Sequence, residues 1–135
     1  MNSSELQART RSFGLSIIRY SARLPRKMET QIIARQLMRA ATSVGANYRA
    51  ACRAKSRADF IAKMPIVEEE ADESLYWLDL LGELLPKPNA DVSALKQEAS
   101  ELVAIAVSSK KTARSRASAA GNRQSSIVNP QAANG

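Results

Sequence analysis

The 135-residue sequence has no histidine and a single cysteine, Cys52. The chain therefore lacks the usual protein ligand sets for zinc, haem and iron–sulfur clusters. The same absence excludes Ser-His-Asp and Cys-His catalysis. We expect no cofactor, no metal site and no enzymatic activity, and we interpret Cys52 as a small core residue.

Aromatic residues make up only 4% of the chain, and there are five glycines and five prolines. So few turn-forming residues argue against a β-sandwich, whose many short strands need many turns. Hydrophobic residues nevertheless reach 44%, which is enough to fill an aliphatic core. The length predicts a single domain, and the abundance of alanine, leucine, arginine and glutamate favours helix.

Long apolar runs are also missing. The N-terminus lacks the apolar segment of a signal peptide, and no run approaches the roughly 20 residues that span a bilayer. The lone cysteine fits a reducing compartment. These features predict a soluble, cytoplasmic protein without a membrane role.

Charge is strongly segregated along the chain, which carries a net charge of +7. Residues 1–58 contain twelve Lys/Arg and two acids, whereas residues 59–101 contain three and eleven. Residues 102–135 contain five Lys/Arg and no acid. Such asymmetry indicates a polyanionic partner, or attraction between the two halves or between subunits.

Apolar residues recur at helical spacing in four segments, 4–24, 29–55, 58–85 and 91–110. Short connections between them predict an antiparallel up-and-down four-helix bundle over residues 1–111. Ser4, Ser56 with Asp59, and either Asn89 or Asp91 are the expected helix caps. Pro65 should kink the third helix or shift its start. Residues 112–135 are polar and aperiodic, which predicts a disordered tail.

Basic residues of the second helical segment are expected to form one stripe opposite its apolar side. Three interpretations remain open: a track for phosphates, a surface paired with the acid-rich third helix of a neighbouring subunit, or a solvated face. Glu70 is expected to pair with Arg39 or Asn47. The candidate nucleic-acid or partner-binding residues are Arg35, Arg39, Arg49, Arg53 and Arg57.

The third helical segment carries a second apolar strip beside its core stripe. A monomeric bundle needs about one stripe per helix, so the surplus strip predicts an oligomer interface. The adjacent run of Glu68, Glu69 and Glu70 points in three directions, so it does not form a metal site. Leu81 also falls in the surplus strip, and the candidate subunit contacts are Ile66, Trp77, Leu80 and Leu84.

The segments "MRAATSVGANYRAACRAKSRADF" and "EEEADESLYWLDLL" carry a family resemblance. Over roughly residues 10–108 the chain resembles the bacterial 23S ribosomal RNA intervening-sequence proteins. Its basic character is most similar to the accessory variability determinant branch of diversity-generating retroelements. The resemblance implies a homopentameric barrel of helical bundles that binds a reverse transcriptase and RNA and has no enzymatic activity. Pro65 departs from the family pattern.

The sequence thus predicts a non-enzymatic, homo-oligomeric helical scaffold whose basic face binds nucleic acid, a reverse transcriptase, or both. The alternative is a purely structural oligomer, in which the basic helix pairs with the acidic helix of neighbouring subunits and has no nucleic-acid role.

Overall fold

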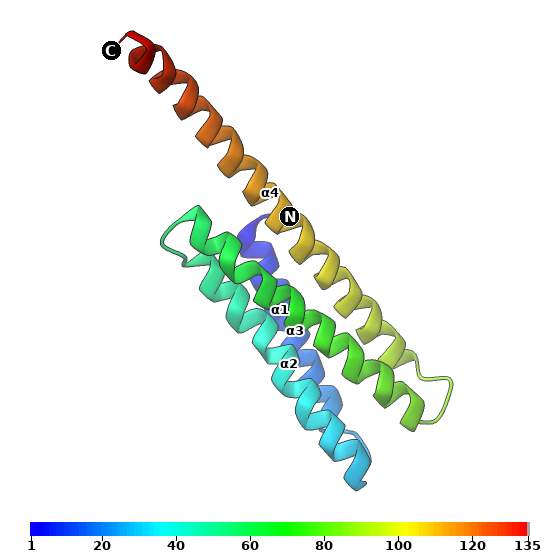
Figure 1. Cartoon of the computed structure of the whole chain (residues 1–135). Coiled ribbons are helices and arrows are strands. Elements are labelled where there is room, and N and C mark those ends of the chain that lie inside the picture. The colour runs from blue at the N-terminus through cyan, green and yellow to red at the C-terminus, as the bar shows by residue number, and fades with distance from the viewer. Residues whose placement is uncertain (135) are drawn as a thin grey trace.

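The computed structural model describes the backbone of residues 1–134 and the side chains of residues 1–119. These residues form four helices and no strand: α1 (Ser3–Ser21), α2 (Met28–Cys52), α3 (Arg57–Leu84) and α4 (Ala90–Asn134). Each helix runs antiparallel to the one before it (Figure 1). The predicted all-α, four-helix architecture is confirmed.

Helix α1 begins with a reciprocal cap that differs from the prediction. The Oδ1 atom of Asn2 accepts from the Glu5 amide at 2.8 Å, and the Asn2 amide donates to Glu5 Oε2 at 3.1 Å. Ser4 lies inside the first turn and is not the cap. A capping box satisfies two amides that the helix leaves without partners, which explains why the helix begins two residues earlier than Ser4 suggests.

The predicted caps Ser56 of α3 and Asn89 of α4 are confirmed. Ser56 Oγ accepts from the Asp59 amide at 3.1 Å and begins α3. The Asp59 carboxylate accepts from the Lys55 amide at 3.4 Å. Asn89, the first of the two candidates for α4, accepts from the Val92 amide at 3.0 Å. Short polar side chains therefore fix where α3 and α4 begin.

The core consists of the apolar stripes that the sequence predicts, one from each helix. Burial of these aliphatic side chains is the main source of stability for such a bundle. Leu81 is an exception to the prediction, because it is completely buried instead of lying in the surplus strip. The largest fully buried apolar side chains are Ile17, Leu37, Val44, Met64, Leu78 and Leu81.

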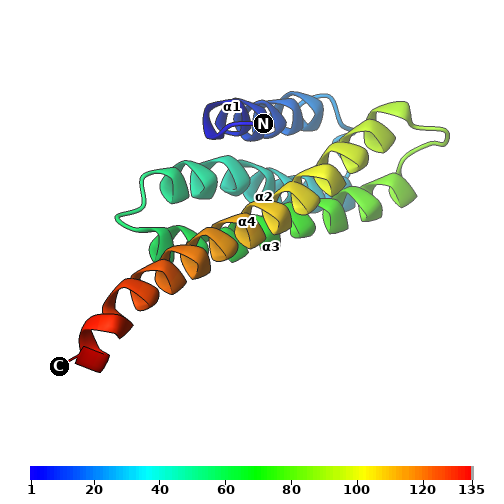
Figure 2. The same cartoon turned by 90° about the horizontal axis from the view of Figure 1, so that it is seen from above.

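Helix α1 is set apart from α3 and α4 and packs mainly on α2 (Figure 2). Arg9 links α1 to α4. Its Nε atom donates to Glu98 Oε2 at 2.8 Å, and its Nη2 atom donates to Glu101 Oε1 at 3.1 Å. These contacts raise the pKa of Arg9, the hydrogen bond with Glu98 being the largest cause. A charged bridge between partly exposed side chains thus joins the first and last helices.

Two predictions about helix boundaries are corrected. Helix α3 starts at Arg57 and continues through Pro65, so the proline does not shift the start. Helix α4 does not end at Lys110 but continues to Asn134 and projects beyond the bundle (Figure 1). Residues 112–120 are rich in alanine and arginine, which have high helix propensity even without an apolar stripe. Ala113 is buried and extends the core into this region.

Within residues 1–134, no helix combines the length and the apolar character required to cross a membrane. No three carboxylate or thiol side chains of the described part of the chain are placed to hold a metal ion.

Candidate nucleic-acid interface

The outward side of α2 carries three of the predicted arginines, Arg35, Arg39 and Arg49. All three are exposed, whereas Leu37 and Val44 of the same helix are completely buried. At 100° per residue, Arg35 and Arg39 lie about 200° from Leu37, and Arg49 lies about 140° from Val44, so all three point away from the core. The helical period therefore places these guanidinium groups on one solvent-facing side.

The predicted stripe is wrong at its C-terminal end, because α2 stops at Cys52. Arg53 occupies the C-cap, where its amide donates to the Arg49 carbonyl at 3.2 Å, and Arg57 is the first residue of α3. Both are exposed. A positive charge suits the C-terminal end of α2 but not the N-terminal end of α3. Because Arg53 caps α2, it extends the basic surface of that helix, whereas Arg57 belongs to α3.

Arg39 lies at the edge of this surface that faces α3. Its Nη1 atom lies 3.2 Å from Glu70 Oε2, and its Nη2 atom pairs with Glu73. Glu73 also accepts from Trp77 Nε1 at 3.1 Å. The predicted Arg39–Glu70 pair is confirmed, and the alternative with Asn47 is wrong: the Asn47 amide donates to the Ser43 carbonyl of its own helix at 2.8 Å. Arg39 thus has intrachain partners for its charge.

The remaining four candidates form no ion pair with any residue that the structure describes. Guanidinium groups without carboxylate partners are available to external anions. We use the name basic face for the exposed arginines on the side of the molecule formed by α2, namely Arg35, Arg49 and Arg53, together with Arg11 described next.

Arg11 of α1 is a member that the sequence does not predict. Arg11 and Arg49 both line a groove of about 570 Å³ between α1 and α2, beside Gly14 and Gly45. The two helices approach closely because glycine leaves room for the neighbouring backbone. Periodicity within one helix cannot reveal this arrangement, since it depends on which sides of two helices meet. The sequence signal is that Gly14 and Gly45 are each the single glycine of their helix.

The predicted oligomer interface lies on the outward side of α3. Ile66 is 42% and Leu84 47% exposed, while Trp77 and Leu80 are half-buried. Trp77 packs against the core and meets Tyr76 edge to face, with ring centroids 5.0 Å apart. Tyr76 is 55% exposed and enlarges the apolar surface beyond the predicted residues. Ile66, Tyr76, Trp77, Leu80 and Leu84 are called the apolar strip below.

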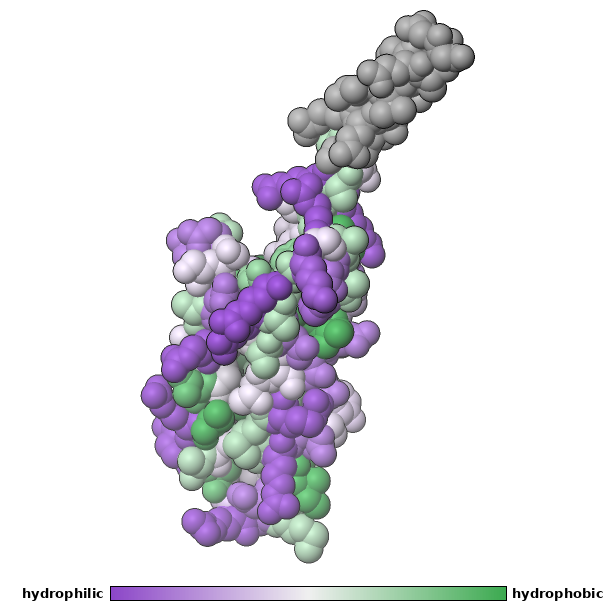
Figure 3. Space-filling model, turned by 90° about the vertical axis from the view of Figure 1, so that its left-hand side faces the viewer, coloured by the Kyte–Doolittle hydropathy of each residue, from purple (hydrophilic) through white to green (hydrophobic). Residues whose placement is uncertain are grey.

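One face of the molecule is mixed in character. Figure 3 shows a face on which hydrophilic stretches alternate with smaller apolar patches.

The fold and the charge distribution define a class of protein, a small all-helical four-helix protein with a basic outer face. The family model for the 23S rRNA-intervening sequence protein matches residues 3–108. The chain belongs to this family, as its motifs suggest.

A solved structure supports the same assignment. It is a protein of unknown function from the S23 ribosomal protein family of Bacteroides thetaiotaomicron, and it is 30% identical to this chain. The alignment covers 82% of this chain and 99% of that one, with a TM-score of 0.74. No curated protein matches the chain. The family and its fold are therefore established.

Proposed function

We propose that this protein is a non-enzymatic, homo-oligomeric helical scaffold whose basic face binds the backbone of a nucleic acid, RNA in the first place. The observation that carries the proposal is the set of exposed arginines around α2 that lack acid partners among the described residues. As an accessory factor of a diversity-generating retroelement, the scaffold would present RNA to a reverse transcriptase, its proposed protein partner.

The chemistry of the basic face suits phosphate. The planar guanidinium fork binds phosphate oxygens in pairs, and a row of such groups on rigid helices releases counterions from the nucleic acid. Arg11 and Arg49 place two guanidinium groups along one groove. No aromatic side chain lines that groove, so base stacking is not part of the interaction there. Binding is therefore directed at the backbone and depends little on sequence.

The apolar strip supports the assembly part of the proposal. Exposed isoleucine, tyrosine and leucine beside a half-buried tryptophan are typical of subunit interfaces. A pentameric ring, in accord with the family resemblance, would repeat the basic face around its circumference. Repetition raises the effective affinity of weak phosphate contacts.

The test is RNA retention by the full chain after Arg35→Glu/Arg49→Glu. These two arginines are exposed and unpaired within the described residues, so their reversal leaves the core intact. Lys111→Glu/Arg114→Glu is the matched control, because it removes the same amount of positive charge from exposed positions on α4. We expect loss of RNA retention in the first variant and little change in the second. Equal retention by all three proteins contradicts the proposal.

A second candidate is a purely structural oligomer, and the contacts of Arg39 favour it. They show that arginines of α2 and carboxylates of α3 fit together within one subunit. Glu69 and Asp72 of α3 are exposed and form no ion pair with the described residues, so they could receive arginines of a neighbouring subunit. In that case Arg35→Glu/Arg49→Glu lowers the oligomer mass in light scattering, while the wild type retains no RNA at physiological salt.

A further inference from the structure

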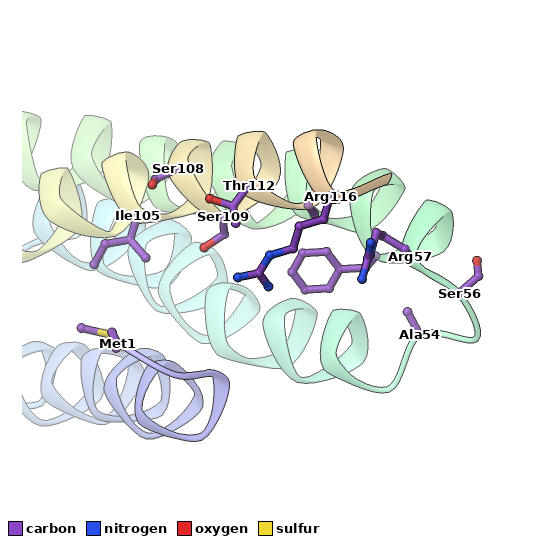
Figure 4. Close-up of a pocket in the computed structure, with 11 residues that line it drawn as sticks. Met1, Ala54, Ser56, Arg57, Ile105, Ser108, Ser109, Thr112 and Arg116 are labelled. Carbon is purple, nitrogen blue, oxygen red and sulfur yellow. The ribbon is translucent and has the colours of Figure 1, made fainter. Parts of the chain in front are cut away.

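A cavity of about 770 Å³ lies at the end of the bundle where α2 passes into α3. Its walls come from the α2–α3 connection, the start of α3 and the α4 segment between Ile105 and Arg116 (Figure 4). Its size falls within the range of small-molecule sites. Thr112, Ala113 and Arg116 of this wall lie beyond Lys110, where the sequence predicts that the helix has ended. The cavity therefore depends on the continuation of α4.

Charge in the cavity has one sign. Arg57 and Arg116 line it, and no acidic residue does. Neither arginine forms an ion pair with the described residues. The nearest acid in sequence, Asp59, already has a partner, because Lys63 Nζ lies 2.8 Å from both of its carboxylate oxygens. Two guanidinium groups therefore face the cavity with their charge uncompensated.

The position of Arg57 needs an explanation. A positive charge on the first residue of a helix opposes the helix dipole, so α3 gains nothing from it. A residue that conflicts with local preference points to a functional requirement. An anion in the cavity would meet two guanidinium groups, because both Arg57 and Arg116 line it.

The remaining walls add an aromatic ring and several hydroxyl groups. Phe60 is half-buried, packs against the core and lines the cavity. Ser108, Ser109 and Thr112 present hydroxyl groups along one side of α4 (Figure 4). A phenyl ring can stack on any base, and hydroxyl groups can bind sugar or phosphate oxygens. No carboxylate or amide side chain is present to read the edge of a base.

From this arrangement we propose that the cavity binds a nucleoside 5′-phosphate, with its phosphate on Arg57 and Arg116 and its base against Phe60. The group is either a free nucleotide or the 5′-phosphorylated end of a strand. Binding discriminates little between bases, and the phosphate is essential. The proposal does not depend on the proposed function, because Arg116 lies on α4 and outside the basic face.

The experiment is calorimetric titration of the full-length protein with AMP, with adenosine as the ligand that lacks the phosphate. Arg116→Gln removes one guanidinium from an exposed helical position and should weaken AMP binding about tenfold, since a charge-assisted contact to phosphate is lost. Arg114→Gln is the matched control, two residues away on the same helix and outside the cavity. It should bind AMP as the wild type does. Phe60→Leu keeps apolar volume but removes the ring, and should also weaken binding.

Three results would overturn the proposal: no AMP binding at millimolar concentration, equal binding of adenosine and AMP, or equal weakening by Arg114→Gln and Arg116→Gln. The last result would show nonspecific attraction to a basic helix. Competition identifies the source of the nucleotide once AMP binds. Displacement of AMP by a 5′-phosphorylated oligoribonucleotide but not by its 5′-hydroxyl form supports a strand end, and displacement by neither supports a free nucleotide.

Discussion

The backbone of Thr10 in α1 lies so close to Gly45 in α2 that a Cβ atom on residue 45 would stand 3.3 Å from the Thr10 carbonyl carbon and oxygen. This approach sets the spacing of the first two helices. The groove that holds Arg11 and Arg49 is a consequence of it. The geometry of the basic face therefore depends on one residue without a side chain.

Gly45→Ala should destabilise the protein by about 1 kcal/mol, because the helix backbone of α1 cannot yield as a flexible side chain would. Gly14→Ala is the control. A Cβ there would meet Ala41 and Thr42 atoms at 3.5 Å, an ordinary contact, so alanine should stabilise α1 by about 0.5–1 kcal/mol through its helix propensity. Urea denaturation of both variants measures the difference. Equal stabilisation by the two substitutions would show that α1 and α2 are not closely packed at Gly45.

Ser21→Ala should stabilise the protein by about 1 kcal/mol. The Ser21 hydroxyl oxygen is buried and has no hydrogen-bond partner among the described residues, which is a cost that alanine removes. Ser74→Ala serves as comparison, because the buried Ser74 hydroxyl donates to the Glu70 carbonyl at 2.8 Å. No stabilisation is expected there. Thermal unfolding that ranks Ser74→Ala as the more stable variant would contradict this account.

Lys63→Met should raise the pKa of Asp59. In the folded protein that pKa lies below its ordinary value, chiefly because the Lys63 ammonium group donates to the Asp59 carboxylate. A pKa that is lower in the folded than in the unfolded state stabilises the fold above the unfolded pKa, and the contribution is lost as the pH falls below about 4. NMR titration of the Asp59 carboxyl carbon measures the shift. An identical titration curve in Lys63→Met would refute the assignment of the cause.

Leu84→Glu should reduce the oligomer mass while leaving helix content unchanged. The side chain is 47% exposed on the apolar strip, so the charge is tolerated by the subunit but not in a buried subunit contact. Ile32→Glu is the matched control, since Ile32 is 55% exposed on α2, away from the strip. Light scattering and circular dichroism of both variants decide the matter. Dissociation by Ile32→Glu alone would move the interface to α2.

The sequence predicts those features of a single helix that leave a periodic pattern or a capping residue. The buried stripe of α1, for example Phe13 and Ile17, follows from a period of 3.6 residues, which is why four helices and their core could be predicted. The Ser56 and Asn89 caps follow from local hydrogen bonding in the same way.

Helix ends without a turn signal, helix continued without an apolar stripe, and contacts between two helices could not be predicted in this way. Because the end of α2 at Cys52 carries no glycine or proline signal, the sequence predicts one continuous stripe that includes Arg53 and Arg57. The proximity of Arg11 to Arg49 arises from packing of α1 on α2, and the continuation of α4 beyond Lys110 arises from propensity without a stripe. The sequence predicts the Arg39–Glu70 pair as one of two alternatives, but it does not predict the second ion pair, between Arg39 and Glu73.

The most direct test of the central claim is RNA binding by the full chain across a salt titration, with oligomer mass measured by light scattering in the same buffers. The account predicts an oligomer whose log affinity falls steeply and linearly with log salt, and a slope reduced by about 1–2 units in Arg35→Glu/Arg49→Glu. An oligomer that binds no RNA at physiological salt would contradict the claim and assign the arginines of the basic face to assembly.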